Sequence, residues 1–392
     1  MRSVASGLCS VLLNYRRLVN KGDTMIFRIW VVIFWVGLLM GCSEPTKNES
    51  AGKMVQPEKV YRWRLVTAWP KNFPGMGMAP EHIADAVREM SNGRLDIKVY
   101  GAGEIVPALE VFEAVSQGTV QMGHSSAYYW RGSVPAAQFF TAVPFGLTAQ
   151  EMNGWLLHGG GLALWEELYA RYDLLPIPGG NTGVQMAGWF NKEINSLADL
   201  KGIKMRIPGL GGEVFEAAGG TAVTIPGGEI FTSLQTGVID AAEWVGPYND
   251  LSIGFHQVAK YYYYPGWQEP GPNLELIINK QAWESLPADL QAILRTASLA
   301  VNNDVLAQYT ARNNKALKEL VEQHGVEVRR LPDDVLAQLK LISDERVAEL
   351  VGEDELSKRI YQSYETFRKE MTAYNEYSER AFMKVRAALE GY

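Results

Sequence analysis

The sequence predicts an α/β fold with two lobes, and three observations carry this prediction. Residues 203–244 alternate short apolar runs with helical patterns, and glycine or proline marks each change. Such β-α-β-α-β order is typical of α/β proteins. The segment 229–239 (EIFTSLQTGVI) repeats the pattern of 110–120 (EVFEAVSQGTV), and a helical pattern dominates after residue 280. We therefore expect mixed sheets, a cleft between the lobes and long C-terminal helices.

The central unit, residues 203–244, places polar side chains at strand ends. A helix is expected around Val214 and Phe215, capped by Gly219, and a second helix is expected over 230–234. Strands are expected at 203–207, 221–225 and 238–239. Ligands of α/β proteins bind beyond the ends of strands, so Arg206 and the pair Glu243-Trp244 become the first candidates for function.

The N-terminus predicts a targeting segment. Arg28 precedes an apolar run over 29–40, which has the length of a signal-peptide core and is short for a membrane span. The run ends in Leu39-Met40-Gly41-Cys42, which resembles the lipobox of bacterial lipoproteins. That resemblance implies a signal peptide over 1–41 and lipidation of Cys42. An ordinary secretory signal with an incidental cysteine is the alternative, and Met25 is an alternative start to Met1.

Charge and cysteine content limit the partners. The two cysteines, Cys9 and Cys42, both lie at the N-terminus, so no disulfide or thiol chemistry is expected in the folded domain. The leader holds five of the 37 Lys and Arg and one of the 44 Asp and Glu, which leaves a net charge of −11 on the other 351 residues. This charge argues against nucleic acid or anionic lipid as a partner. A single buried arginine could still bind a small anion.

The domain boundaries follow the pattern changes along the chain. Residues 42–59 are polar and predict a flexible tether. Lobe I is expected over 60–184, with a later segment near 270–305 crossing back to it, and lobe II over 185–269. Within them we expect a helical stretch over 150–172, a strand-like segment over 179–190, and strands at 60–66, 95–100, 261–264, 274–279 and 325–331. Residues 306–392 are expected to form a helical region.

A short motif raises the question of hydrolase chemistry. Residues 123–127 (GHSSA) differ from the Gly-x-Ser-x-Gly nucleophile elbow only in the last alanine. Histidines follow at 158, 256 and 324, but no acid is paired with one of them in the sequence, so we discount a serine hydrolase. The preferred interpretation is a strand end that enters the cleft, with Tyr129 and Trp130 forming an aromatic wall.

The remaining polar candidates suit a hard cation. The chain has no HExxH, no CxxC, no GxGxxG after a strand and no GxxxxGK[ST], so redox and phosphoryl-transfer chemistry has no support. Gln185, Glu243, the Trp244 backbone and Glu269 offer oxygen ligands of the kind that Na⁺ or Ca²⁺ takes. Arg206 offers a planar fork that matches a carboxylate. Each of these residues would also fit a surface charge or a structural bridge.

Three segments carry a resemblance to a known family. Residues 201–209 (KGIKMRIPG), 227–247 (GGEIFTSLQTGVIDAAEWVGP) and 261–271 (YYYYPGWQEPG) resemble the solute-binding proteins of TRAP transporters, particularly the subgroup for 2-oxo acids and related monocarboxylates. The similarity runs from about Tyr61 to the C-terminus. It implies a fold like that of periplasmic binding proteins, with two α/β lobes closing on an organic acid. The arginine that pairs with the acid's carboxylate in that family corresponds to Arg206.

The resemblance also implies a metal site. A cation bridges protein and substrate in the 2-oxo-acid subgroup, and its ligands correspond to Gln185, Glu243, Trp244 through its carbonyl, and Glu269. The implied substrate contacts are Arg206, Gln185, Glu243 and Tyr129. The pair Glu243-Trp244 stands where the dicarboxylate subgroup usually has an asparagine, which argues against C4-dicarboxylates. A lipid anchor departs from the common soluble form of the family.

We therefore expect a periplasmic, membrane-anchored binding protein, not an enzyme, that hands a 2-oxo acid such as pyruvate to TRAP permease subunits. The identity of the acid and the choice between Na⁺ and Ca²⁺ stay open. The alternative from another class is a cation-dependent hydrolase with Glu243 and Glu269 as acid and base.

The C-terminal segment bears on oligomeric state. Apolar residues from Ile360 to Ala388 follow a 4-3 spacing that predicts one helix over 356–390. This helix either lies on its own lobe or, as in some relatives in the 2-oxo-acid subgroup, mediates a homodimer.

Overall fold

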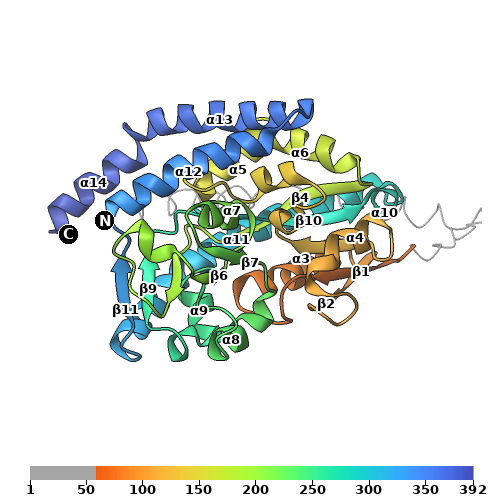
Figure 1. Ribbon diagram of the computed structural model, residues 1–392. Helices are drawn as coiled ribbons and strands as arrows, with labels where there is room; N and C mark the ends of the chain where they lie inside the picture. The colour runs from red at the N-terminus through yellow and green to blue at the C-terminus, as the bar shows by residue number, and fades with distance from the viewer. Residues whose placement is uncertain (1–58, 392) are drawn as a thin grey trace, which may run out of the picture. The chain divides into compact units, whose positions relative to one another are not determined.

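A computed structural model describes residues 59–391 of the chain. The signal peptide over 1–41, Cys42 and all but the last residue of the expected tether lie outside the described residues. Within the described part, two mixed sheets organise the fold, as expected (Figure 1). Sheet A has the strand order β2-β1-β3-β10-β4, and sheet B has the order β11-β9-β5-β8-β6-β7.

The strands are short, and their hydrophobic side chains lie in the core. Sheet A consists of β1 (Tyr61–Thr67), β2 (Leu95–Tyr100), β3 (Met122–Ser125), β4 (Leu174–Asn181) and β10 (Asn273–Asn279). Sheet B consists of β5 (Gly188–Phe190), β6 (Lys204–Arg206), β7 (Thr221–Val223), β8 (Ala241–Ala242), β9 (Tyr261–Tyr264) and β11 (Glu327–Arg330). In β2 and the first half of β1, buried residues alternate with more exposed ones, whereas β10 is buried along its whole length.

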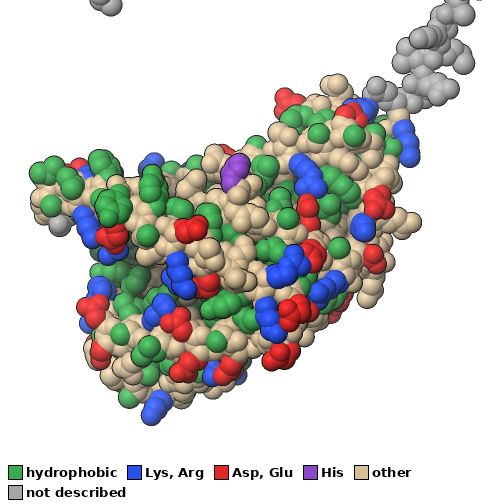
Figure 2. Space-filling view, turned by 90° about the horizontal axis from the view of Figure 1, so that it is seen from above, with side chains coloured by type: hydrophobic (Ala, Val, Ile, Leu, Met, Phe, Trp, Pro, Cys, Tyr) green, Lys and Arg blue, Asp and Glu red, His purple; other side chains and the backbone are tan. Residues whose placement is uncertain are grey.

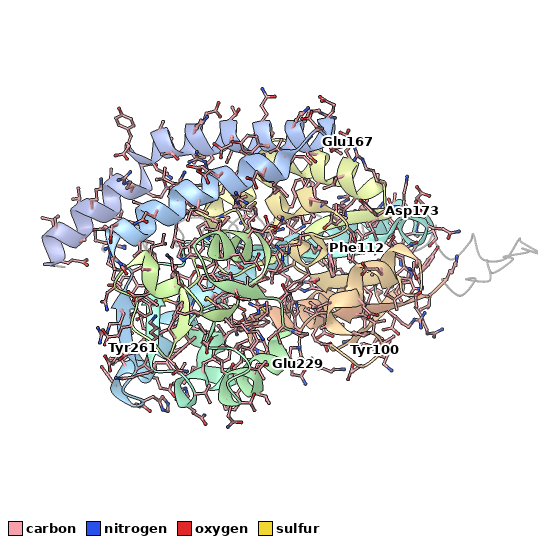
Figure 3. The ribbon with its side chains drawn as sticks, viewed as in Figure 1. Tyr100, Phe112, Glu167, Asp173, Glu229 and Tyr261 are labelled. Carbon is pink, nitrogen blue, oxygen red and sulfur yellow. The ribbon has the colours of Figure 1, made fainter. Side chains whose placement is uncertain are left out.

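The internal similarity in the sequence marks two equivalent units. In sheet A, β1, α3 (Ala79–Met90), β2, α4 (Val111–Ser116) and β3 follow one another, and the three strands are parallel in the order β2-β1-β3. In sheet B, β6, α7 (Gly209–Ala217), β7, α8 (Gly227–Gln235) and β8 follow the same path, in the parallel order β7-β6-β8. Phe112 in the first copy and Glu229 in the second are labelled in Figure 3. In each of these two similar units, the repeated segment therefore covers the second helix and leads into the third strand.

Several expected boundaries are wrong for local reasons. The strand expected at 238–239 begins instead at Ala241, because the N–H groups of Val238 and Ile239 both donate to Ser233 O at the end of α8 (2.9 and 3.2 Å). The helix expected over 150–172 is two helices, α5 (Ala149–His158) and α6 (Gly161–Ala170). Gly160 separates them with φ of +88°, a conformation that favours glycine.

The strand-like segment expected over 179–190 is also two strands, and they belong to different sheets. β4 ends at Asn181 in sheet A, and β5 begins at Gly188 in sheet B. Gln185 therefore lies on a connection between the sheets and not in a strand. The return connection runs from β9 through Glu269 to β10.

Helices dominate the end of the chain, where α10 (Lys280–Glu284), α11 (Ala288–Glu322), α12 (Asp333–Val351), α13 (Glu355–Asn375) and α14 (Glu379–Glu390) follow one another. The long helix α11 packs on β4 and α3, beside sheet A, and on α9 (Pro247–Ile253), which follows β8 of sheet B. Among the described residues, no helix has both the length and the hydropathy needed to cross a bilayer.

The single helix expected over 356–390 is interrupted. α13 ends at Asn375 and α14 begins at Glu379, because Ser378 has non-helical angles (φ −118°, ψ −121°). α13 packs on α6 of its own chain, which carries Glu167, labelled in Figure 3. Arg359 donates to both carboxylate oxygens of Glu167 (2.7 and 2.9 Å). The first part of the apolar 4-3 stripe, which lies on α13, therefore packs against the rest of its own chain.

Candidate functional site

The site begins where two parallel strands end side by side. Arg206 is the last residue of β6, and Glu243 follows β8, which pairs with β6 in parallel. The Glu243 N–H donates to Arg206 O (3.1 Å), and Arg206 Nη1 donates to Glu243 O (3.0 Å) and to Glu243 Oε1. The two side chains are 1% and 0% exposed. The ion pair is thus fully buried.

The guanidinium of Arg206 also reaches sheet A. Its Nε donates to Ile225 O (3.2 Å) and its Nη2 donates to the hydroxyl of Tyr129 (3.2 Å), which lies in the 3-10 turn η3 (Ala127–Trp130) after β3. The guanidinium carbon lies 5.0 Å from the centre of a Trp244 ring. Arginine has five N–H donors, and these bonds use four of them. One N–H on Nη2, beside Tyr129, remains for a ligand.

The two remaining candidates meet at the crossings between the sheets. The Gln185 N–H donates to Glu269 O (3.1 Å), and the Gln185 side-chain amide nitrogen donates to Thr182 Oγ1 (3.3 Å). Both Gln185 and Glu269 are buried. Gly266 allows this contact, since a Cβ there would lie 2.1 Å from Gln185 O. The outgoing and returning connections therefore pack backbone against backbone.

Three buried oxygens of this cluster lack a hydrogen-bond partner in the described structure. They are Gln185 Oε1, Glu243 Oε2 and Glu269 Oε2. A buried oxygen without a partner destabilises a protein, and most buried polar atoms are satisfied. Two carboxylates and an amide oxygen are ligands that a hard cation prefers, so the residues fit Na⁺ or Ca²⁺. Among the described residues no three His, Cys, Asp or Glu gather to hold a metal, since this cluster has only two carboxylates.

Burial and mutual repulsion perturb the two carboxyls. Burial raises the pKa of Glu243 to about 7, although the neighbouring Arg206 lowers it. Burial and then the charge of Glu243 raise the pKa of Glu269 well above its ordinary value. Two carboxylates in one enclosed site disfavour each other's ionised form. A bound cation would favour the ionised form of both carboxyls.

Aromatic rings line the candidate site, but they are not the expected pair of Tyr129 and Trp130. Trp69 packs on Tyr129 and on Trp244, and Phe73 packs on Trp244, each at 6.1 Å between ring centres. Trp130 instead points into the core of sheet A's side, where its Nε1 donates to Glu275 (2.5 Å). Successive residues of a 3-10 turn point about 120° apart, so neighbours in η3 face different surroundings.

The GHSSA motif has a structural role for its histidine. His124 is buried, its Nδ1 accepts from Trp69 Nε1 (2.9 Å), and its Nε2 donates to Gly179 O (3.0 Å). Burial lowers the pKa of His124 to about 4. Both ring nitrogens are occupied, and Ser125 Oγ has no hydrogen-bond partner among the described residues. The motif therefore forms no nucleophile–base pair.

Sequence reasoning missed a residue that holds the loop of Glu243 in place. Asp250 of α9 accepts from Tyr262 OH (2.7 Å), Trp189 Nε1 (3.0 Å) and the Val245 N–H (3.3 Å). Burial raises its pKa to about 6. Pro247 at the start of α9, with an acid in the first turn, is a helix-start signal that could have drawn attention to it.

Comparison with known proteins assigns the family. Residues 65–354 match bacterial extracellular solute-binding protein, family 7. The chain therefore belongs to this family of extracytoplasmic transport proteins, which are not enzymes. The expected class of protein is confirmed, and nothing supports the hydrolase alternative.

Individual relatives are similar over nearly their whole length. The monocarboxylate 2-oxoacid-binding periplasmic protein of Nostoc sp. (strain PCC 7120) is 45% identical over 321 residues, which cover 82% of this chain and 88% of that protein. A TRAP periplasmic solute-binding protein from Pseudoalteromonas atlantica T6c, solved with bound sodium and pyruvate, is 45% identical with a TM-score of 0.81, covering 83% of this chain and 99% of that one.

A second solved relative carries a different cation and acid. A TRAP transporter solute-binding protein from Bordetella bronchiseptica RB50 is 37% identical with a TM-score of 0.83, covering 85% of this chain and 99% of that one. It is described as a mixed occupancy dimer with calcium and picolinate in the occupied active site. Both solved relatives thus hold a cation together with a small organic acid.

Proposed function

We propose that this protein captures a 2-oxo acid, such as pyruvate or a related monocarboxylate, together with Na⁺ or Ca²⁺, and delivers the acid to the membrane subunits of a TRAP transporter. The single observation that carries the proposal is the set of three partnerless buried oxygens on Gln185, Glu243 and Glu269. The cations and acids in the solved relatives support the same assignment.

We assign the roles of the residues from their contacts and, for the Trp244 carbonyl, from the resemblance to the 2-oxo-acid subgroup. Gln185, Glu243, Glu269 and the Trp244 carbonyl would hold the cation. A bound cation would offset the charge of the two carboxylates and offer coordination positions to the oxygens of the acid. Arg206 neutralises Glu243 and keeps one N–H on Nη2 for the acid's carboxylate, next to Tyr129. The arginine thus contributes one donor with the tyrosine beside it, in place of the free fork that its side chain alone suggested.

A ligand screen by thermal shift and calorimetry tests the function. Pyruvate and other 2-oxo acids are expected to raise the melting temperature and to bind without being consumed. Succinate serves as the control, since the Glu243-Trp244 pair argues against C4-dicarboxylates. Binding of succinate in preference to every 2-oxo acid, or turnover of an ester or amide substrate, would overturn the proposal.

Closure of two lobes is the proposed mode of capture. Residues 60–184 with 270–305 would move as lobe I and residues 185–269 as lobe II, with the crossings near Gln185 and Glu269 as hinges. Closure removes water from Arg206 and the carboxylates, which strengthens their electrostatic contacts with the ligand. Small-angle scattering with and without pyruvate checks this, and an unchanged radius of gyration would contradict it.

We also propose that the mature protein is anchored by lipid at Cys42 on the extracytoplasmic side of the membrane. The Leu39-Met40-Gly41-Cys42 sequence supports this proposal. Metabolic labelling with a palmitate analogue is expected to mark the wild type, whereas Cys42→Ala should be unlabelled and leave the membrane fraction. Labelling of Cys42→Ala would contradict the assignment.

A homodimer through the C-terminus is the last part of the proposal. No residue of α14 is buried, and Phe382, Met383, Val385 and Leu389 are more than half exposed. Figure 2 shows hydrophobic side chains gathered on this arm of the molecule. Light scattering should report a dimer for residues 43–392 and a monomer for residues 43–375. A monomer for the longer chain at every concentration would contradict it.

A further inference from the structure

Three segments far apart in the sequence meet at the hydroxyl of Tyr309. This hydroxyl donates to Asn249 Oδ1 (2.7 Å) and accepts from the Met76 N–H (3.2 Å). Asn249 Nδ2 donates in turn to Pro74 O (2.9 Å). Tyr309 and Asn249 are both 0% exposed. The contacts therefore form one polar network, in which the side chains of Tyr309 and Asn249 are fully buried and Pro74 is half-buried.

Each segment of the network belongs to a different part of the fold. Pro74 and Met76 lie in the loop between β1 and α3, beside sheet A. Asn249 lies on α9, which directly follows the Glu243–Trp244 segment of sheet B. Tyr309 lies on α11, which packs against elements of both sheets. The network thus links the loop between β1 and α3 to helix α9, which follows the candidate cation ligands in the chain. The network residues are not themselves candidate ligands.

The backbone is shaped to receive the Tyr309 ring. Gly75 has φ of +67°, and a Cβ at this position would lie 2.5 Å from the ring and its hydroxyl. The same loop carries Phe73, which packs on the ring of Trp244 in the site. The loop between β1 and α3 therefore contacts the candidate site through Phe73, and it takes part in the polar network through Pro74 and Met76.

We propose that the Tyr309–Asn249–Pro74 network is a latch that holds the two lobes closed and so sets ligand affinity from outside the site. This rests on the proposed function. When the lobes are closed, the Tyr309 hydroxyl and the Asn249 amide are shielded from water and depend on their partners in the protein. When the lobes separate, water satisfies these groups. Removing one partner therefore costs more in the closed form than in the open form. The latch residues position the site and make no ligand contact.

Tyr309→Phe tests the latch, because it deletes the hydroxyl and keeps the ring. With pyruvate as the probe, the variant should bind about tenfold more weakly, chiefly through faster dissociation, since mutational effects on related complexes appear mainly in the off-rate. Tyr364→Phe is the matched control. Tyr364 is equally buried, and its hydroxyl accepts from the Leu147 N–H (2.8 Å), a contact between α13 and the segment before α5. That variant should bind pyruvate like the wild type.

A second measurement separates closure from simple stability. Asn249→Ala and the double variant complete a mutant cycle, in which the two substitutions should be strongly non-additive for pyruvate dissociation. Small-angle scattering of ligand-saturated Tyr309→Phe should show a larger open fraction than ligand-saturated Tyr364→Phe. Equal affinity and equal dissociation rates for Tyr309→Phe and wild type would overturn the latch. A greater loss of ligand-free melting temperature than in Tyr364→Phe, without faster dissociation, would also overturn it. Failure of the wild type to bind any 2-oxo acid would instead refute the proposed function.

Discussion

Two buried glutamates, one in each sheet region of the fold, have the same raised pKa and different surroundings. Glu275, on β10 of sheet A, accepts from Trp130 Nε1 (2.5 Å) and Tyr169 OH (2.7 Å), one donor on each oxygen. Glu243, after β8 of sheet B, has one oxygen bonded to Arg206 and one with no partner in the described structure. Burial raises the pKa of each to about 7.

The comparison separates a structural carboxyl from a candidate ligand site. A raised pKa by itself reports burial, and both groups have it. Of these glutamates, Glu243 has a partnerless oxygen, as have the neighbouring Glu269 and Gln185, and such oxygens leave coordination positions for a ligand that the chain does not supply. The hydrogen-bonded carboxyl of Glu275 stabilises the region of sheet A. The carboxyls of Glu243 and Glu269, each with a partnerless oxygen, destabilise the ligand-free protein but are available to bind a ligand.

The largest expected effect on stability and on pyruvate binding comes from replacing a residue that donates hydrogen bonds to each glutamate. Arg206→Lys breaks the buried pair with Glu243 and the bond to Tyr129, so it should destabilise the protein by about 3 kcal/mol and abolish pyruvate binding. Tyr169→Phe removes one donor from Glu275 and should cost about 1–2 kcal/mol with binding unchanged. Urea unfolding and calorimetry measure both. If Arg206→Lys retains wild-type affinity, Arg206 is a structural ion pair only.

The next largest effect is on the stability of the ligand-free protein, which two matched glutamate-to-glutamine substitutions should change in opposite directions. Glu269→Gln removes a carboxyl that repels Glu243, so the ligand-free protein should become more stable by about 1 kcal/mol while pyruvate affinity falls about 100-fold. Glu275→Gln places an amide before one of two hydrogen-bond donors and should lower stability by about 1–3 kcal/mol with affinity unchanged. Thermal melts without ligand decide the sign. A lower melting temperature for Glu269→Gln would show that its carboxylate braces the loop.

The smallest effect is a dependence on pH. The folded-state pKa values of Glu243 and Glu275 are raised from 4.5 to about 7, so the folded protein binds more protons than the unfolded chain between these values. Stability of the ligand-free protein should therefore fall as pH rises from about 4.5 to 7. Affinity should rise over about pH 6 to 8, because the cation needs ionised carboxylates. Calorimetry should find the full rise in Glu275→Gln and a smaller rise in Glu269→Gln, which keeps only the carboxyl of Glu243. Loss of the rise in Glu275→Gln would show that affinity depends on the ionisation of Glu275 and would contradict the comparison.

Local signals made much of the fold predictable. Helix, glycine and strand recur in 110–120 and 229–239, and the structure shows two like units there. Arg206 and Glu243 are predictable because each lies at the end of a short strand in one parallel unit, and parallel strands bring such ends together. Gln185 and Glu269 are candidates as oxygen ligands at loop ends, but only the resemblance to a family puts them in one site, since nothing local shows that their two connections touch.

What escaped prediction depends on contacts between distant residues or on irregular backbone. Tyr309 meets Met76 across 233 positions, a pairing that no periodic pattern encodes. The 4-3 stripe continued through Ser378 and hid the break between α13 and α14. The predicted aromatic wall of Tyr129 and Trp130 is wrong for Trp130, because adjacency in sequence carries no information on where successive residues of a 3-10 turn point.

The most direct test of the account is pyruvate calorimetry on protein stripped of metal, with Na⁺ and Ca²⁺ restored one at a time. The three partnerless oxygens predict that stripping weakens binding at least tenfold, that one of the two cations restores it, and that Glu269→Gln responds little to either step. Unchanged wild-type affinity after exhaustive removal of both cations would contradict the account, and Arg206 with Tyr129 would then hold the acid alone.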